Sequence, residues 1–460
     1  MKKRIHLIGI GGTGMSSIAR VLLEQGWAVS GSDRLLSPLA LELRAAGALI
    51  YEGHDSRHVQ GVDLVVRSSA INDENPEVAA AVRLGIPVMK RQEFISELSK
   101  DRMCIAVAGS HGKTTTSTMM AWSLAQLGLD PGYILGGVSR DLGNNARAGT
   151  GEHFVIEADE YDYMFLGLIP AVILLSNVEY DHPDCFPTVE KYQAAFSTFV
   201  NQLEPGGLLV TNADDPGSFS KLTDAPASAR VVTYGLTTSA DYTAVDVKPN
   251  TMGGFEFIVQ ANPLQKTVAS VSLRVPGIHN VRNALGVLAA LHALGFPVQQ
   301  VAQALSAYTG SGRRFEVIAE VDGITIVDDY AHHPSKITAT LSAARARYPN
   351  RRIIAVWQPH TYSRTQALEV DFINAFHDAD LVIVTAIYAA REAAQAYTSA
   401  QLVKKIDYVS ARYIPLIPAV VDFLLENLQP GDVLIVLSAG DADQVCREVK
   451  VRLHERKGTP

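Results

Sequence analysis

Short apolar runs that end in glycine or polar residues alternate along the chain with stretches of helical periodicity. Four of these runs are RIHLIGIGG, MCIAVAGS, FVIEADE and DVLIVLSAG. Apolar strands that alternate with helices are typical of parallel α/β sheets. We therefore predict an α/β protein, and because such sheets bind ligands at the carboxyl ends of their strands, we expect the functional residues there.

The pattern divides into three segments, since a chain of 460 residues is too long for one compact core. Residues 1–100 begin with the strand IHLIG, residues 101–311 with MCIAVAGS, and residues 312–460 contain GITIVDDYAHH. Glycine accepts backbone angles that other residues avoid, so the stretch Gly310-Ser311-Gly312 is the predicted hinge between the last two segments. We predict three domains with these boundaries.

Composition narrows the class of protein. Hydrophobic residues make up 47% and charged residues 19%, and a formal net charge of -8 argues against a nucleic-acid or membrane-surface binder. The three cysteines are far apart and lack C-x-x-C spacing, which favours a reducing cytoplasm over a disulfide framework or a zinc ribbon. The apolar run after the basic start is short and broken by glycine, and no long apolar span follows, so we expect neither an export signal nor membrane insertion.

The first glycine-rich loop, GIGGTG at Gly9 to Gly14, follows a strand and opens a helical pattern. Asp33 ends the next strand about 20 residues later, which is the spacing of a dinucleotide-binding fingerprint. The glycines permit a tight turn and bring a diphosphate close to a helix N-terminus, whose free N–H groups favour anions. NAD, FAD and nucleotide sugars all present such a diphosphate, and a plain glycine turn is the alternative.

The second glycine-rich loop reads VAGSHGKTTT at residues 107–116, with Val107 where the P-loop pattern G-x-x-x-x-G-K-[ST] has its first glycine. It also lies between a strand and a helical stretch. Its amides can cradle phosphates, Lys113 can neutralise β- and γ-phosphate charge, and the Thr114 hydroxyl can ligate Mg²⁺. This setting indicates a nucleoside triphosphate site.

Two acidic clusters follow that loop. They are Glu157, Asp159, Glu160 and Asp162 in FVIEADEYD, and Asn177, Glu179, Asp181 and His182 in VILLSNVEYDH. Either cluster alone is explained by a solvated acidic loop. Two clusters at strand ends beside a phosphate loop favour Mg²⁺, which prefers oxygen ligands, and the positioning of a nucleophile.

Further polar residues lie at helix starts and strand ends. They are His279, Asn280 and Asn283 in GIHNVRNA, Arg313 and Arg314 in GRRFE, Asp328, Asp329, His332 and His333 in DDYAHHP, and His360 and Arg364 in WQPHTYSRT. The first group suits either helix capping or an adenine edge, and the paired arginines suit a surface salt bridge. The adjacent histidines suggest zinc, but the HExxH spacing is absent, so the pattern disfavours a transition metal. A guanidinium such as that of Arg364 is the natural partner of a carboxylate.

Together the shortened P-loop, EADE, DH, HNxxNA, RRFE, DDYAHHP and QPHxYSRT closely resemble the motifs of the Mur ligases of peptidoglycan synthesis. The resemblance covers nearly the whole chain, with the motifs in family order. It implies an N-terminal Rossmann-like domain for a UDP-sugar, a central P-loop ATPase domain and a C-terminal Rossmann-like domain for an amino acid. The ligand expected at the first glycine-rich loop thereby changes from NAD to a UDP diphosphate.

The resemblance also implies ligand sets, carried over by position. The UDP-sugar set is Gly11, Gly12, Thr13, Gly14, Met15, Asp33, His54, Ser68 and Ser69. The ATP set is Gly109, Ser110, His111, Gly112, Lys113, Thr114, Thr115, His279, Asn280, Asn283, Arg314 and Asp329. The amino-acid set is Tyr330, His332, His360 and Arg364, and the metal set is Thr114, Glu157 and His182. The catalytic set is Lys113, Glu157, His182, Arg314, Asp329 and His332.

The implied reaction is an ATP-dependent, ADP-forming ligation through an acyl phosphate, with Mg²⁺ bound and His182, Asp329 or His332 as acceptor of the amine proton. The motifs match best the family members that join L-alanine to UDP-N-acetylmuramate, and we expect a monomer or a homodimer. Two departures are Thr361, where those members commonly have arginine, and Tyr161 in EADEYD, a form familiar from the ligases that attach a recycled tripeptide. The segment AIYAARE favours the alanine reaction. Attachment of a recycled tripeptide is the close alternative. A nucleotide-sugar oxidoreductase would leave Lys113 and both acidic clusters unexplained, and a switch ATPase would leave Tyr330, His332 and Arg364 without a role.

Overall fold

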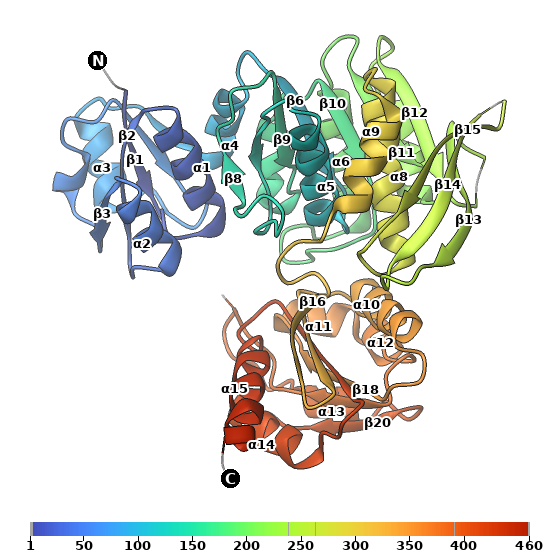
Figure 1. The fold of residues 1–460 in the computed structure, drawn as a ribbon. Coiled ribbons are helices and arrows are strands. Elements are labelled where there is room, and N and C mark those ends of the chain that lie inside the picture. The colour runs from blue at the N-terminus through green and yellow to red at the C-terminus, as the bar shows by residue number, and fades with distance from the viewer. Residues whose placement is uncertain (1–2, 238, 263, 391, 459–460) are drawn as a thin grey trace.

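The structure is a computed structural model that describes residues 3–237, 239–262, 264–390 and 392–458. Three α/β domains, each built on its own sheet, follow one another along the chain (Figure 1). The N-terminal and central domains lie side by side, and the C-terminal domain lies below the central one in that view. The predicted α/β class and the three-domain architecture are confirmed, whereas the boundaries at residues 101 and 312 remain our proposal.

The N-terminal sheet has the strand order β3-β2-β1-β4-β5, and all its strands are parallel. Its strands are β1 (Arg4–Ile8), β2 (Ala28–Asp33), β3 (Leu49–Glu52), β4 (Leu64–Arg67) and β5 (Val88–Lys90). Its helices are α1 (Thr13–Glu24), α2 (Pro38–Ala45), α3 (Pro76–Arg83) and α4 (Arg91–Phe94), with the 3₁₀ turns η1 (Ser56–Val59) and η2 (Ile95–Leu98). Because the chain order reverses between β1 and β4, the first glycine-rich loop lies at the switch point where such sheets bind ligands.

The central sheet has ten strands in the order β15-β14-β13-β12-β11-β10-β6-β9-β7-β8. The strands are β6 (Met103–Ala108), β7 (Gly132–Ile134), β8 (Ala146–Arg147), β9 (His153–Glu157), β10 (Val172–Leu175), β11 (Leu208–Asn212), β12 (Arg230–Gly235), β13 (Tyr242–Pro249), β14 (Phe255–Ala261) and β15 (Lys266–Ser272). The helices are α5 (Lys113–Gln126), α6 (Val189–Asn201), α7 (Pro216–Phe219), α8 (Ile278–Ala293) and α9 (Val298–Ala307), with the 3₁₀ turns η3 (Tyr161–Gly167) and η4 (Ser220–Asp224). The expectation of parallel sheets throughout was too simple, because β13, β14 and β15 pair antiparallel and extend the parallel sheet as a meander.

The C-terminal sheet has the order β16-β17-β21-β18-β19-β20, with only β16 antiparallel to its neighbour. Its strands are β16 (Glu316–Val321), β17 (Ile324–Asp329), β18 (Ile353–Gln358), β19 (Leu381–Val384), β20 (Ser410–Tyr413) and β21 (Val433–Ser438). Its helices are α10 (Pro334–Arg347), α11 (Tyr362–Ala367), α12 (Glu369–Ile373), α13 (Ser399–Val403), α14 (Ile417–Asn427) and α15 (Gln444–Gly458). The buried strands β17 and β18 end in the DDYAHHP and QPHTYSRT motifs, as the apolar runs predict.

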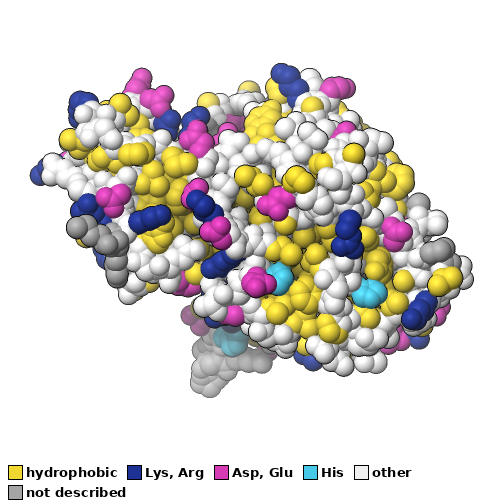
Figure 2. Space-filling model, turned by 90° about the horizontal axis from the view of Figure 1, so that it is seen from above, with side chains coloured by type: hydrophobic (Ala, Val, Ile, Leu, Met, Phe, Trp, Pro, Cys, Tyr) yellow, Lys and Arg dark blue, Asp and Glu magenta, His cyan; other side chains and the backbone are white. Residues whose placement is uncertain are grey.

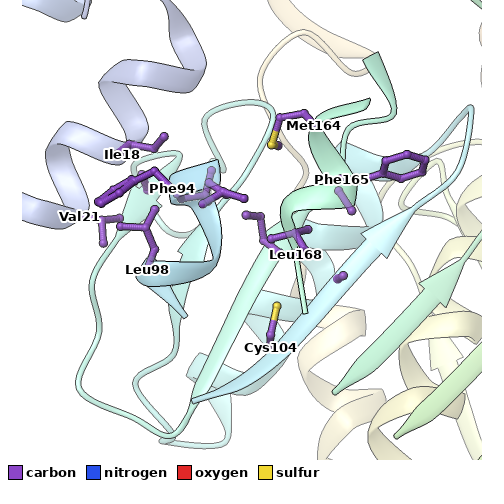
Figure 3. Packing of buried hydrophobic residues seen from close by; sticks show 14 of the residues in the cluster. Ile18, Val21, Phe94, Leu98, Cys104, Met164, Phe165 and Leu168 are labelled. Atoms are coloured by element: carbon purple, nitrogen blue, oxygen red, sulfur yellow. The ribbon is translucent and has the colours of Figure 1, made fainter. Parts of the chain in front are cut away.

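The N-terminal and central domains share one hydrophobic cluster (Figure 3). Ile18 and Val21 of α1 and Phe94 of α4 are buried in the same cluster as Met164 and Leu168 at η3 of the central domain. Apolar packing of this kind is non-directional and resists separation. We therefore regard these two domains as one packed body. On the face shown in Figure 2, basic and acidic side chains are interspersed over that body.

The central and C-terminal domains are joined by the linker around Gly310. This glycine has φ 118°, and Gly312 N donates to Val138 O at 2.9 Å, so the predicted hinge is bonded to a central-domain loop. Just beyond it, Arg313 and Phe315 have φ values of 56° and 46°, a left-handed conformation that is costly for such side chains. Among the described residues, no helix is both long and apolar enough to cross a bilayer.

Candidate active site

The second glycine-rich loop connects β6 to α5 in P-loop fashion. Gly112 has φ 80° and precedes the first helical residue, and a Cβ added to it would lie 2.8 Å from Asn283 Oδ1. A Cβ added to Gly109, where φ is 138°, would collide with the Ser176 hydroxyl. Both positions therefore require glycine. The turn directs the first N–H groups of α5 into a cavity, as a phosphate site needs.

Lys113 is held by a buried carboxylate. Its Nζ donates to Gly109 O at 2.7 Å and to Glu160 Oε2 at 2.5 Å. Burial alone would raise the pKa of Glu160, but the charge of Lys113 lowers it to about 2. Glu160 thus stays ionised and fixes the ammonium beside the loop.

The side chains suited to Mg²⁺ meet next to Lys113. Thr114 Oγ1 lies 3.2 Å from Glu157 Oε1, and the other Glu157 oxygen accepts from Gly136 N at 2.8 Å. A hydroxyl and a carboxylate are the hard oxygen ligands that Mg²⁺ prefers, so these two residues fit the ion. Across the domain boundary, Arg314 donates from its terminal nitrogen to Thr114 Oγ1 at 3.0 Å.

A cavity of about 370 Å³ opens at this point between the central and C-terminal domains. Its lining includes all residues of the predicted ATP set except Gly109: Ser110, His111, Gly112, Lys113, Thr114, Thr115, His279, Asn280, Asn283, Arg314 and Asp329. Asn280 and Asn283 are bonded to each other at 3.1 Å, and Asp329 accepts from the backbone N–H groups of Phe315 and Ala331. Because the two domains supply opposite walls, movement of the C-terminal domain changes the shape of this cavity.

The second acidic cluster faces the C-terminal domain. Asp181 is fully buried and accepts from Arg364 Nε at 3.1 Å. Burial alone would raise its pKa, but His182 and Arg364 hold it well below the usual range. His182 itself contacts Arg364 through Nδ1 at 3.2 Å and lies 3.5 Å from Glu160 through Nε2. The contacts of His182 therefore run to Glu160 and Arg364, and its place in the metal set remains a prediction.

The predicted amino-acid residues gather at the ends of β17 and β18. Arg364 contacts His360 Nδ1 at 3.2 Å, and the His360 and His332 ring centroids are 6.0 Å apart. His332 in turn lies edge-to-face with Tyr330 at 5.2 Å. Thr361 is buried and caps α11 by accepting from Arg364 N at 3.4 Å, so it contributes a helix cap where an arginine would have contributed charge. Arg391 of the AIYAARE segment lies outside the described residues.

In the N-terminal domain, Asp33 accepts from Gly11 N at 2.8 Å and shapes the loop that contains Gly12, Thr13 and Gly14. Met15 is buried in the core, so only its backbone remains available to a ligand. His54 bonds to Ser32 Oγ and to the buried Glu77.

Ser68 and Ser69 line a separate cavity of about 290 Å³ with Arg67, Lys90 and Arg91, facing Asp162 and Met164 of the central domain. The Arg91 guanidinium lies so close to Gly14 that a Cβ there would collide with it. This cavity therefore has cations beside the predicted diphosphate loop.

Sequence reasoning left five residues of the site out of the ligand sets. Arg91, Ser335 and Lys336 line the cavities, and Glu160 and Asp181 pair with Lys113 and Arg364. Glu160 and Asp181 belong to the two acidic clusters. Because a buried carboxylate needs a cationic partner, pairing these clusters with the nearby lysine and arginine motifs could have selected them. The other three have no motif signal, because tertiary packing alone brings them to the site.

Comparison with known proteins identifies the family. Three Mur ligase models match in succession: the family's catalytic domain over residues 4–103, its middle domain over 107–291 and its glutamate ligase domain over 313–440. The UDP-N-acetylmuramate–L-alanine ligase of Syntrophus aciditrophicus is 41% identical, over 98% of this chain and 94% of that protein. The enzyme of the same name from Geobacter sp. strain M21 is 40% identical, over 99% and 98%.

Similar solved structures point to the same family. The UDP-N-acetylmuramate–alanine ligase of Thermotoga maritima superimposes with a TM-score of 0.82 at 27% identity, covering 98% of this chain and 99% of that one. A murein peptide ligase from Psychrobacter arcticus reaches 0.71 at 28% identity, covering 98% of each chain. With matching domain models, relatives 40–41% identical over nearly the whole chain and the same three-domain fold, the chain belongs to the Mur ligase family.

Proposed function

We propose that this protein joins L-alanine to the lactyl carboxylate of UDP-N-acetylmuramate, with cleavage of ATP to ADP and phosphate. The observation that carries the ligase chemistry is the P-loop cavity, in which Arg314 of the C-terminal domain donates to Thr114 of the central domain. The choice of substrates rests on the full-length relatives that bear this name at 40–41% identity.

The first step activates a carboxylate, which is a poor electrophile by itself. A lactyl oxygen attacks the γ-phosphorus of ATP, the bond from that phosphorus to the bridging oxygen breaks, and ADP leaves. We assign Lys113 and Arg314 to the charge that spreads over the phosphoryl oxygens, because both cations line the cavity. When bound by Thr114 and Glu157, Mg²⁺ would supply further charge neutralisation there.

The second step forms the amide. The neutral amine of the amino acid attacks the acyl carbon of the acyl phosphate, and phosphate leaves from the tetrahedral intermediate. His182, Asp329 and His332 remain the proposed proton acceptors. Burial lowers the pKa of His332 well below its usual range, so its ring is a weak base, and both Asp329 oxygens already accept backbone hydrogen bonds. Both nitrogens of His182 also have contacts, to Arg364 and Glu160, so the three residues stay equal candidates.

The second candidate is attachment of a recycled tripeptide to UDP-N-acetylmuramate. It is favoured by the fold similarity to the murein peptide ligase and by Tyr161, whose ring packs edge-to-face on His182 at 5.1 Å and whose hydroxyl donates to Asp184.

Phosphate release from ATP tests the proposal. With UDP-N-acetylmuramate and Mg²⁺ present, L-alanine should support turnover, whereas the other single amino acids and L-Ala-γ-D-Glu-diaminopimelate should not. Turnover with the tripeptide alone would favour the second candidate. Formation of NADH from NAD and a nucleotide sugar would restore the oxidoreductase alternative.

We also propose a cytoplasmic location, where UDP-linked precursors and ATP are both available, and a monomeric or homodimeric state.

A further inference from the structure

Three potential metal ligands meet where the P-loop faces the C-terminal domain. His111 belongs to the P-loop, Glu179 follows β10, and His333 precedes α10. Within the described ranges, these form a group of three whose ligand atoms all lie within 4.8 Å of one another. His111 Nε2 lies 2.7 Å from Glu179 Oε2, and the two imidazole centroids are 4.8 Å apart.

His333 is the unusual member of the group. Only 3% of its surface is exposed, yet among the residues that the structure describes neither of its ring nitrogens has a hydrogen-bond partner, and the buried Nδ1 of His111 also lacks one. Buried polar atoms without partners are rare in native proteins, because they lose hydrogen bonds to water and gain none. His111 Nε2 already contacts Glu179, so Nδ1 is the unpartnered nitrogen of that ring, while His333 has an unused lone pair on whichever nitrogen lacks the proton.

We propose that His111, Glu179 and His333 form a binding site for a transition metal of the zinc class that bridges the central and C-terminal domains. Two imidazoles and one carboxylate with a fourth position for water are a common zinc ligand set. The set differs in chemistry from Thr114 and Glu157, whose oxygens suit Mg²⁺.

The surroundings support this assignment. Ser335 Oγ donates to the second Glu179 oxygen, Oε1, at 2.5 Å, which orients the carboxylate in the way that outer partners orient metal ligands. In a tetrahedral site the ligand atoms are roughly 3.3 Å apart, so a small further closure of the domains brings the group to coordination distance.

A metal bound at the His111–Glu179–His333 site would affect domain motion. His333 moves with the C-terminal domain and His111 with the P-loop, so a metal bound to both holds the nucleotide cavity closed. Many ligases and kinases require such closure and then opening for product release. Zinc should therefore slow turnover at saturating Mg²⁺. This consequence, unlike the binding itself, rests on the proposed function.

Metal binding is measured on the chelator-treated full-length protein, with Mg²⁺ in excess. Cobalt(II) is the probe, because its visible absorption reports tetrahedral nitrogen and oxygen coordination, and zinc should displace it. We expect one equivalent bound by the unaltered protein and at least about a hundredfold weaker binding by His333→Gln, since loss of an outer partner alone costs ten- to a hundredfold. His153→Gln is the matched control, because His153 is also buried and has an unpartnered ring nitrogen.

The possible results distinguish a failure of the metal-site proposal from a failure of the proposed function. Equal cobalt binding by His333→Gln and the unaltered protein, or no binding at tens of micromolar metal, would overturn the proposal. If His333→Gln does not fold by circular dichroism, Glu179→Gln supplies the same test with an isosteric side chain. Cobalt binding without ligase activity in any assay would leave the metal site standing and refute the proposed function instead.

Discussion

Arg364 of the C-terminal domain donates from Nε to Oδ1 of Asp181 in the central domain at a distance of 3.1 Å. The arginine is 4% exposed and the aspartate is fully buried. Lys336, also of the C-terminal domain, lies 3.7 Å from the other Asp181 oxygen. The contact between these domains is therefore built on charge, whereas the contact between the N-terminal and central domains is built on apolar packing.

Arg364→Lys tests the expectation that this guanidinium holds the carboxylate of the incoming amino acid. A lysine cannot make the parallel bonds of a planar guanidinium, and losing one bond to a charged group costs roughly 1.5 to 3 kcal/mol. We expect the amino-acid KM to rise about ten- to a hundredfold while the KM for ATP changes little. Steady-state kinetics with each substrate varied in turn measure both values.

Asp181→Asn is the companion variant, because in the structure the Arg364 nitrogens already contact Asp181, His182 and His360. If Arg364 binds the amino acid, Arg364→Lys should cause a large rise in the KM for the amino acid. Asp181→Asn should then cause only a smaller rise in the KM of any substrate. Identical defects in the two variants, spread over all substrates, would instead identify Arg364 as part of the domain contact.

Lys113→Met should abolish ligation while leaving binding of the UDP-sugar nearly intact. Lys113 lies in the nucleotide cavity, whereas the first glycine-rich loop lies in another domain. Loss of one charge-assisted contact in the transition state costs ~3 kcal/mol or more, which is about two orders of magnitude in rate. Rapid-quench kinetics give the rate and calorimetry gives the affinity for UDP-N-acetylmuramate. An equal loss of that affinity would contradict the assignment of the two loops to different ligands.

The parts of this site that could be predicted are local in sequence. Gly112 must be glycine because its φ is 80°, and Lys113 and Thr114 follow from the turn into α5, so a short motif contains the whole arrangement. Glu157 and Asp329 end strands of parallel sheets, and the carboxyl ends of such strands face ligands in this class of fold.

The remaining parts depend on contacts between distant segments. Arg91 reaches Gly14 only because α4 packs beside the first loop, and the His111–His333 pair exists only once two domains meet. The antiparallel strands β13 to β15 also escaped prediction, because their alternating half-buried pattern differs from the continuous apolar runs elsewhere.

Arg91→Ala should weaken binding of the UDP-sugar by about tenfold or more, since one charge-assisted hydrogen bond to a diphosphate contributes roughly 1.5 to 3 kcal/mol. The guanidinium lies beside Gly14 in the cavity between the N-terminal and central domains. Calorimetry with UDP-N-acetylmuramate measures the effect, and the KM for ATP should be unchanged. Arg83→Ala, which removes an exposed arginine of the same domain, is the control. Equal affinities for the two variants would exclude Arg91 from the site.

Glu77 is a fully buried carboxylate in the N-terminal domain, and it organises the predicted UDP-sugar residue His54. It accepts from Ser32 Oγ at 2.6 Å, contacts His54 and His58 at 2.9 and 2.7 Å, and lies 3.5 Å from His6 Nε2. Burial alone would raise its pKa, but the interactions with His6, Ser32 and His58 lower it to about 2.

A carboxyl group whose folded-state pKa is lowered stabilises the protein above its unfolded pKa near 4.5, and that contribution is lost as the pH falls through about 2. The contribution of Glu77 at neutral pH is therefore roughly 3 kcal/mol. Glu77→Gln should lower the free energy of unfolding of the packed N-terminal and central domains by about this amount at pH 7 and should flatten the dependence of that free energy on pH between 4.5 and 2. Urea titrations across that range measure both effects, with Glu74→Gln, which changes an exposed carboxylate of the same segment, as the control.

Glu77→Gln also removes the carboxylate that contacts His54, so the affinity for UDP-N-acetylmuramate should fall as well. A Glu77→Gln protein as stable as Glu74→Gln at pH 7 would show that the three histidines and Ser32 do not depend on this charge.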